Sequence, residues 1–128
     1  MNIILDTHAL IWFANNDKKL PKKVYNTIIE KDIFTFISVA SIWEISIKLQ
    51  LNKLALDFTV EQLINFIESN NIQIINITIN HVKELDKLPP IHKDPFDRIL
   101  VAQSITENFT LVTADENINK YDVSILWN

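Results

Sequence analysis

The chain has 128 residues, a formal net charge of −4, and neither glycine nor cysteine. Without cysteine there are no disulfides or thiolate sites, and without glycine there is no phosphate-binding loop of the nucleotide-binding folds and no Gly-x-Ser-x-Gly elbow. We expect one domain over residues 1–128 and, from the lack of a membrane-spanning run or secretory leader, a cytoplasmic protein. Any chemistry must therefore come from carboxylates, His, Ser/Thr, Lys or a metal.

The first predicted element is a buried strand that ends in a carboxylate. Ile3-Ile4-Leu5 is a continuous apolar run, which is typical of a strand covered by helices on both faces. Asp6 follows at the carboxyl end, where open α/β sheets form their ligand crevice. Asp6 is also suited to be the N-cap of the helix predicted over His8–Ala14. Taken alone, this stretch favours the cap.

A second helix is predicted over Pro21–Lys31, with Val24, Ile28 and Ile29 as its apolar stripe. Lysines gather at the connection between these two helices. They are Lys18, Lys19, Lys22 and Lys23. A charge cluster of this kind is usually a solvated surface, and we prefer that interpretation to an RNA-contacting patch.

The next segment predicts a strand over Ile33–Ser38 that runs directly into a helix over Val39–Gln50. Glu44 lies on the narrow polar stripe of this helix, together with Ser41 and Lys48. An i,i+4 salt bridge to Lys48 explains Glu44 structurally. Glu44 lies about two turns, roughly 9 Å along the helix axis, from the end of the strand. Its side chain could therefore reach back to the ligand crevice, which is the functional explanation. The sequence leaves both interpretations open.

Residues 57–88 predict a helix, a strand and a helix. Thr59 and Gln62 form a capping box for a helix that continues to Ser69. A strand over Ile72–Ile77 and a short helix over Asn80–Leu88 follow, with His81 expected on the surface of that helix. Proline at positions 89 and 90 ends the helix.

The third acidic position lies in His92-Lys93-Asp94-Pro95-Phe96-Asp97-Arg98. Asp94 is suited to be an N-cap, with Pro95 at the first helical position. Asp97 lies in the first turn, where the helix dipole favours an anion. It also places an acid at a helix start beside the edge of the sheet.

The last segment repeats the pattern of the first. A strand over Phe109–Thr113 leads to Asp115, which precedes a predicted turn over Glu116–Asn119. A final strand over Val123–Trp127 closes the sheet. Capping the turn is the structural role available to Asp115.

Asp6, Glu44, Asp97 and Asp115 each follow a strand or open a helix in a βα alternation. In a right-handed parallel sheet these positions fall at one end. Carboxylates held together repel one another unless a cation neutralises them, and oxygen ligands suit Mg²⁺ or Mn²⁺. Such a site activates water against a phosphodiester. No Ser-His-Asp or zinc-ligand spacing competes with it.

Four segments of this chain resemble the signature segments of PIN-domain ribonucleases, and are most similar to the VapC-type toxins of bacterial toxin–antitoxin pairs. The segments are Ile4–Trp12, Ser38–Ile45, His92–Arg98 and Leu111–Asp115. They occur in order and at similar spacing over nearly the whole chain.

The resemblance implies a PIN-like three-layer α/β/α sandwich with a central parallel β-sheet, and Mg²⁺- or Mn²⁺-dependent endoribonuclease activity. The four acids above fall on the family's catalytic, metal-binding positions. Thr113 falls on a frequent hydroxyl position, and Arg98 belongs to the variant motif around the third acid; we expect supporting roles for both.

The resemblance also implies an RNA substrate, a cognate antitoxin and a homodimer. The sequence adds an ample supply of aromatic residues for an exposed apolar groove suited to a partner helix. These are Trp12, Phe13, Trp43 and Phe58, of which Trp43 is at least as well explained as core.

Two other classes of protein share part of this pattern. A phosphorelay receiver domain has this size but needs paired acids after its first strand, where this chain has Asp6 alone. A non-catalytic PIN-like module that binds RNA or protein is the stronger alternative, because a PIN-like fold can act through binding alone and the low basic content leaves the RNA affinity open. Cleavage of RNA separates the two.

Overall fold

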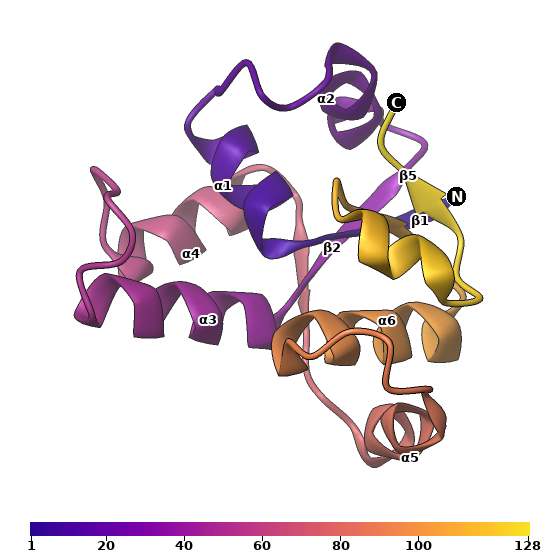
Figure 1. Ribbon diagram of the computed structural model, residues 1–128. Coiled ribbons are helices and arrows are strands. Elements are labelled where there is room, and N and C mark those ends of the chain that lie inside the picture. The colour runs from indigo at the N-terminus through magenta and orange to yellow at the C-terminus, as the bar shows by residue number, and fades with distance from the viewer.

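The computed structural model describes all residues from Met1 to Asn128, and it alternates strands with helices (Figure 1). The strands are β1 (Asn2–Leu5), β2 (Phe34–Ser38), β3 (Gln73–Ile75), β4 (Thr110–Val112) and β5 (Ile125–Leu126). The helices are α1 (Thr7–Ala14), α2 (Lys22–Ile29), α3 (Val39–Gln50), α4 (Val60–Ser69), α5 (Ile79–Lys87), α6 (Pro95–Glu107) and the 3₁₀ helix η1 (Glu116–Lys120).

The five strands form one parallel sheet in the order β3-β2-β1-β4-β5. β1 is the central strand, and Ile4 pairs in register with Phe36 of β2 and Leu111 of β4. All five strands therefore end at the same edge of the sheet, as the sequence predicts.

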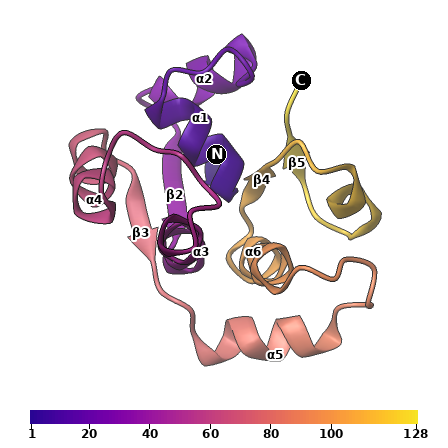
Figure 2. The same cartoon turned by 60° about the vertical axis from the view of Figure 1, so that its left-hand side comes forward.

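Helices cover both faces of this sheet, which confirms the three-layer α/β/α sandwich (Figure 2). Ile3 and Leu5 point into the larger apolar cluster, which they share with α1, α2, α3 and α4. Ile4 points to the other face and packs with residues of α6, β4 and η1. All three side chains are completely buried, so the unalternated run reflects a strand enclosed on both sides. α5 packs on α6 from outside.

Short polar residues begin the helices that leave the carboxyl edge of the sheet. Asp6 accepts a hydrogen bond from the Ala9 amide at the start of α1 (2.8 Å), and Ser38 caps α3 in the same way. Asp94 caps α6 through the Phe96 amide at 2.8 Å. These caps satisfy helix N–H groups that have no partner within the helix.

Several sequence predictions need correction. His81 is buried, with 2% of its surface exposed, because Gln103 and Glu107 of α6 lie against it. Its Nδ1 also completes a capping box by accepting from the Thr78 amide at 3.0 Å. Ile29 is exposed and does not belong to the apolar stripe of α2. Trp43 is 59% exposed rather than core. The strand predicted over Ile72–Ile77 is shorter, because it lies at the sheet edge with one neighbour.

Asparagine takes the left-handed turn positions in this glycine-free chain. Asn16, Asn52, Asn71 and Asn108 have φ of 51°, 54°, 58° and 58°. Asparagine tolerates this region better than other residues with a Cβ atom. Separately, no helix has the length and apolar character needed to span a membrane.

Candidate metal centre

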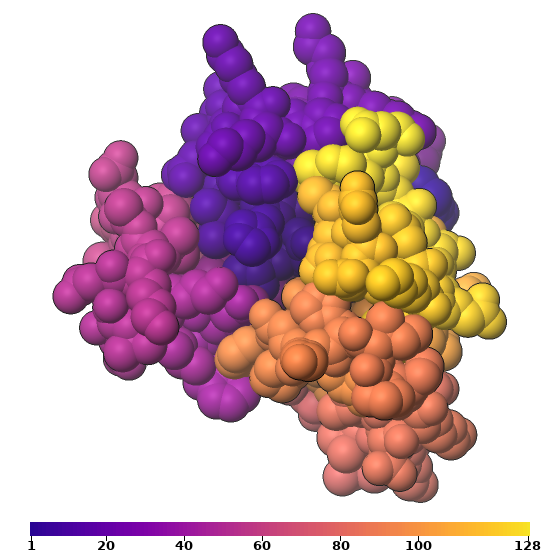
Figure 3. All heavy atoms as spheres, viewed as in Figure 1, coloured from indigo at the N-terminus to yellow at the C-terminus, as the bar shows by residue number.

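The residues that carry the predicted carboxylates lie at the carboxyl edge of the sheet. Figure 1 shows that α1, α3 and α6 begin near one another at this edge. The charges of Asp6, Glu44 and Asp94 all act on Asp97, and the charge of Asp115 acts on Asp6. On the molecular surface, α1, α6 and η1 border one another at the centre of the face that Figure 3 shows.

Asp6 is the most enclosed of these acids, with 6% of its surface exposed. Burial raises its pKa, against the lowering effects of the Ala9 amide and the Thr113 hydroxyl. Thr113 is itself buried, and its Oγ1 also accepts from the Asp115 amide at 3.1 Å. The hydroxyl expected to support the last acid therefore lies between the first and last acids.

Both oxygens of Glu44 have partners. Oε1 accepts a 2.6 Å hydrogen bond from the Thr7 hydroxyl, and Oε2 lies 3.0 Å from Lys48 Nζ. The salt bridge to Lys48 that the sequence suggested is present, but Glu44 is 5% exposed and does not lie on a solvated face. The two interpretations of Glu44 are compatible: it is paired and it faces the acids.

His92 lies between the third and fourth acids. Its Nε2 is 2.7 Å from Asp115 Oδ2 and 3.2 Å from Asp97 Oδ2. The opposite ring nitrogen, Nδ1, accepts from the Asp94 amide at 3.1 Å, which fixes the plane of the ring. The three side chains thereby present one nitrogen and two oxygens within 4.8 Å of one another.

Asp97 is strongly perturbed. Burial, with the nearby charges of Asp94, Asp6 and Glu44, raises its pKa to about 7, although His92 opposes the shift. An acid in this condition resists ionisation until a cation joins it.

Asp115 is perturbed in the opposite direction. Burial tends to raise its pKa, but the hydrogen bond to His92, the Asn117 amide and the charge of His8 lower it below the usual value. Its Oδ1 caps η1 at 2.9 Å from the Asn117 amide, which leaves Oδ2 for His92. Asp6 and Asp115 are therefore caps and cluster members at once.

Arg98, expected to support the third acid, makes no ion pair with a carboxylate. Its Nη1 donates to the Pro89 carbonyl at 2.9 Å and to the Tyr121 hydroxyl at 3.1 Å. The same hydroxyl accepts from the His92 amide at 2.9 Å. Arg98 thus fixes the segment before α6 that carries His92. It acts on the acidic cluster only indirectly, through Tyr121 and the His92 backbone.

Sequence reasoning assigned no role to His92 or Thr7. His92 stands five residues before Asp97 in the same segment, and this proximity was an available signal for a side chain that orients the third acid. No local sequence pattern links Thr7 to Glu44, which lies 37 residues away.

The donor set suits a hard divalent cation. Asp97 and Asp115 offer two carboxylate oxygens in a compact group with His92, and Mg²⁺ and Mn²⁺ bind to a few carboxylates while retaining water. His92 orients these oxygens, because its Nδ1 accepts from the Asp94 amide and its Nε2–H therefore donates to both acids. The raised pKa of Asp97 arises first from burial and then from the neighbouring charges of Asp94, Asp6 and Glu44, which His92 offsets only in part.

A parallel sheet with an acidic centre at its carboxyl edge defines a class of α/β sandwich proteins. The profile of the PIN domain family matches residues 3–124. The chain belongs to the PIN domain family, as its four segments indicated.

Solved structures share this fold over the full chain. A chain of the complex described as VapBC2 from Rickettsia felis bound to a DNA fragment from its promoter aligns with a TM-score of 0.76 at 17% identity, covering 100% of both chains. A toxin–antitoxin complex from Klebsiella pneumoniae aligns at 0.66 and 17% identity, covering 97% of this chain and 95% of that one. VapBC-1 from nontypeable Haemophilus influenzae aligns at 0.64 and 17%, covering 98% and 97%. No curated protein sequence matches.

Proposed function

We propose that this protein is a Mg²⁺- or Mn²⁺-dependent endoribonuclease and the toxin of a toxin–antitoxin pair. The observation that carries the proposal is the cluster of His92, Asp97 and Asp115, joined by the charges of Asp6 and Glu44, at the carboxyl edge of a PIN-domain sheet. No nucleophilic serine or cysteine competes for the role.

The acids would have different roles, which follow from their surroundings. Asp97 and Asp115 would hold the cation with their Oδ2 atoms, near Asp6, and Glu44 would complete the acidic wall. A bound cation of this kind supplies a Lewis acid for phosphoryl oxygens and a water of lowered pKa. Thr113 keeps Asp6 and Asp115 oriented, and Thr7 does the same for Glu44.

An antitoxin partner is supported by an exposed apolar surface beside this site. Trp43 of α3 stacks edge-on against Phe96 of α6 at 5.3 Å, and Val39 is exposed one turn before Trp43. Lys48, already paired with Glu44, shows how a basic side chain is accommodated there. A partner helix covering Trp43 and inserting Arg or Lys among the acids would compete with the cation for the same charge. A homodimer is proposed on the family resemblance.

The proposal is tested by incubating bulk RNA with the purified chain and Mn²⁺, beside Asp6→Asn and an EDTA control. We expect wild type to cleave RNA only with the metal and Asp6→Asn not to cleave it. Cleavage that persists in Asp6→Asn or in EDTA would contradict the proposal. Binding of RNA without cleavage under all conditions would instead indicate a non-catalytic PIN module.

A further inference from the structure

A continuous aromatic and basic surface leaves the acidic cluster along α1. His8 stands two residues after Asp6, is exposed, and its charge acts on both Asp6 and Asp115. Trp12 lies one helical turn further, with its ring centroid 5.7 Å from that of His8. The ring centroid of Trp127, from the other end of the chain, lies 5.7 Å from that of Trp12. Both rings are half-buried, with one side packed against the apolar core.

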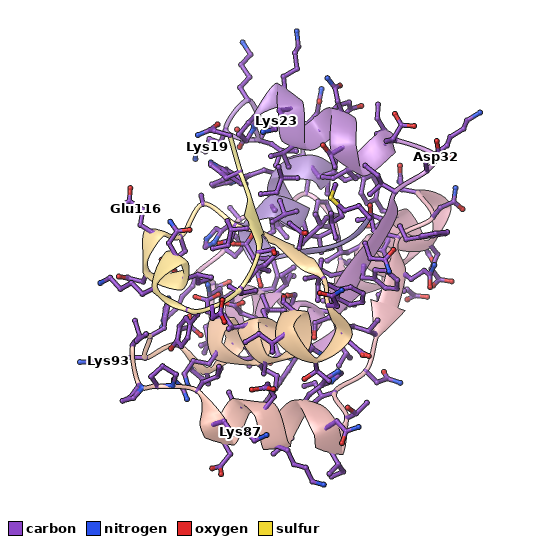
Figure 4. All side chains as sticks on the ribbon, turned by 90° about the vertical axis from the view of Figure 1, so that its right-hand side faces the viewer. Lys19, Lys23, Asp32, Lys87, Lys93 and Glu116 are labelled. Carbon is purple, nitrogen blue, oxygen red and sulfur yellow. The ribbon has the colours of Figure 1, made fainter.

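The lysines of the α1–α2 connection continue this surface. Lys19 Nζ lies 5.9 Å from the centroid of the Trp12 ring, a cation–π distance. Lys19 and Lys23 project outward at the same end of the molecule in Figure 4, whereas Lys87 of α5 projects at the opposite end. We call His8, Trp12, Trp127 and Lys19 the aromatic–lysine strip.

A pocket of about 490 Å³ opens beside the strip. Two aromatic rings, Trp12 and Tyr25, and two ammonium groups, Lys18 and Lys22, contribute to its lining. Asp17 is its one acidic residue, and Asp17 Oδ1 is already engaged with the Lys19 amide at 2.9 Å. The pocket therefore combines π faces with positive charge, and the cleavage chemistry uses none of its residues.

These features distinguish the strip from an ordinary solvated lysine cluster. Single-stranded nucleic acid is bound by aromatic side chains on which bases stack and by cations that follow the backbone. Only unpaired bases can stack on aromatic side chains in this way, because the bases of a closed duplex are already stacked on one another. The strip has both elements and starts at the acidic cluster, which the sequence alone did not reveal.

We propose that the aromatic–lysine strip and its pocket bind single-stranded RNA on one side of the cleaved bond, with bases on Trp12 and Trp127 and phosphates on Lys18, Lys19 and Lys22. This proposal rests on the proposed function, which identifies RNA as the strand that enters the acidic cluster. The new element is the path that the RNA strand takes over the protein surface outside the acidic cluster.

The test measures binding rather than cleavage. A fluorescein-labelled oligouridylate is titrated with the Asp97→Asn protein, which retains the fold but not the full acid set, over a range of salt concentrations. The double variant Lys18→Ala/Lys22→Ala is compared with Lys83→Ala/Lys87→Ala, a pair of exposed lysines on α5 with the same charge change. Each lost phosphate contact lowers the slope of log affinity against log salt by about 0.7.

We expect the first pair to bind the oligouridylate about tenfold or more weakly and to lose roughly 1.4 from the salt slope, and the α5 pair to bind as the parent does. Trp127→Leu, which keeps an apolar side chain against Trp12, should weaken binding about tenfold without changing the slope, and Trp127→Phe should restore most of it. Thermal melting of each variant verifies that it is folded.

Equal losses from the two lysine pairs, or unchanged binding in Trp127→Leu, would overturn the proposal. So would polyglutamate binding as tightly as the oligouridylate, which would identify a surface for an acidic protein. The outcome is separate from that of the proposed function: strip-dependent binding with no cleavage by wild type would reject the nuclease alone, and cleavage with strip-independent binding would reject the strip alone.

Discussion

The hydroxyl of Thr7 lies 2.6 Å from Oε1 of Glu44, and this hydrogen bond joins the start of α1 to α3 across 37 residues. Both residues are buried. It is the short, fixed contact that holds Glu44 toward the other acids, while Lys48 occupies its second oxygen. Removing it tests whether the orientation of Glu44 matters.

Thr7→Val keeps the volume of the side chain and deletes the donor. We expect a loss of stability of about 1–3 kcal/mol, because a buried carboxylate oxygen loses its partner, together with weaker Mn²⁺ binding. Chemical denaturation and calorimetric titration measure the two effects. Thr7→Ser keeps the hydroxyl and should recover metal affinity; a Thr7→Val protein that binds Mn²⁺ like wild type would show that this contact is only structural.

Asp6→Asn should abolish RNA cleavage and leave the fold intact. Asparagine caps a helix about as well as aspartate, so the contact to the Ala9 amide is retained. Thermal stability without metal should hold or rise, because a buried like charge is removed. Thr113→Val, which deletes one orienting hydroxyl, should reduce the cleavage rate less. An inactive Asp6→Asn that also melts much earlier would identify Asp6 as a cap alone.

The raised pKa of Asp97 predicts how the free energy of unfolding varies with pH in the absence of metal. Its pKa is about 7 when folded and near 3.8 when unfolded, so the unfolded chain releases this proton first. The free energy of unfolding therefore falls as pH rises from about 4 to 7, by up to about 1.4 kcal/mol per pH unit, and the fall ends above pH 7. Solvent screening reduces this limit, since 21% of the side chain is exposed.

Asp97→Asn should remove this part of the slope, so that the variant is more stable than wild type near pH 7 and the two converge near pH 4. Denaturation curves at several pH values in EDTA measure the difference. A wild type that gains stability relative to Asp97→Asn as pH rises from 4 to 7 would show that Asp97 ionises readily in the fold.

His92→Gln should weaken Mn²⁺ binding by about tenfold to a hundredfold, the usual effect of losing a group that orients metal ligands. The physical reason is that His92 Nε2 fixes Oδ2 of both Asp97 and Asp115. Calorimetric titration measures the affinity, with His81→Gln as a control far from the acids in the α5–α6 interface. Equal effects of the two substitutions would indicate general loosening rather than a role at the centre.

The sequence predicts most of the fold because local signals and burial agree. The unalternated run Ile3-Ile4-Leu5 indicates a central strand, and the capping box of Thr59 and Gln62 forms as predicted. Asp94 and Pro95 likewise mark the start of α6. At each of these positions, the interaction that determines the structure lies within a few residues.

The parts that sequence reasoning missed depend on residues distant in the chain. His81 looked like a surface residue because its own helix is polar, but Gln103 and Glu107 of α6 enclose it. The lysines near residue 20 looked like a solvated cluster because Trp127 comes from the last strand region. Arg98 stands beside the third acid in sequence, yet its contacts run to Pro89 and Tyr121.

The four asparagines at positive φ have a consequence for the denatured chain. Glycine would relieve the modest strain of these turns, but it would also give the unfolded chain more backbone conformations to lose on folding. A chain with no glycine among its 128 residues has a stiffer denatured ensemble, so ordering each of its turns requires less entropy. The four left-handed asparagines thus raise the free energy of the native state slightly through backbone strain. They also raise the free energy of the denatured state, because that state has less backbone entropy than it would have with glycine.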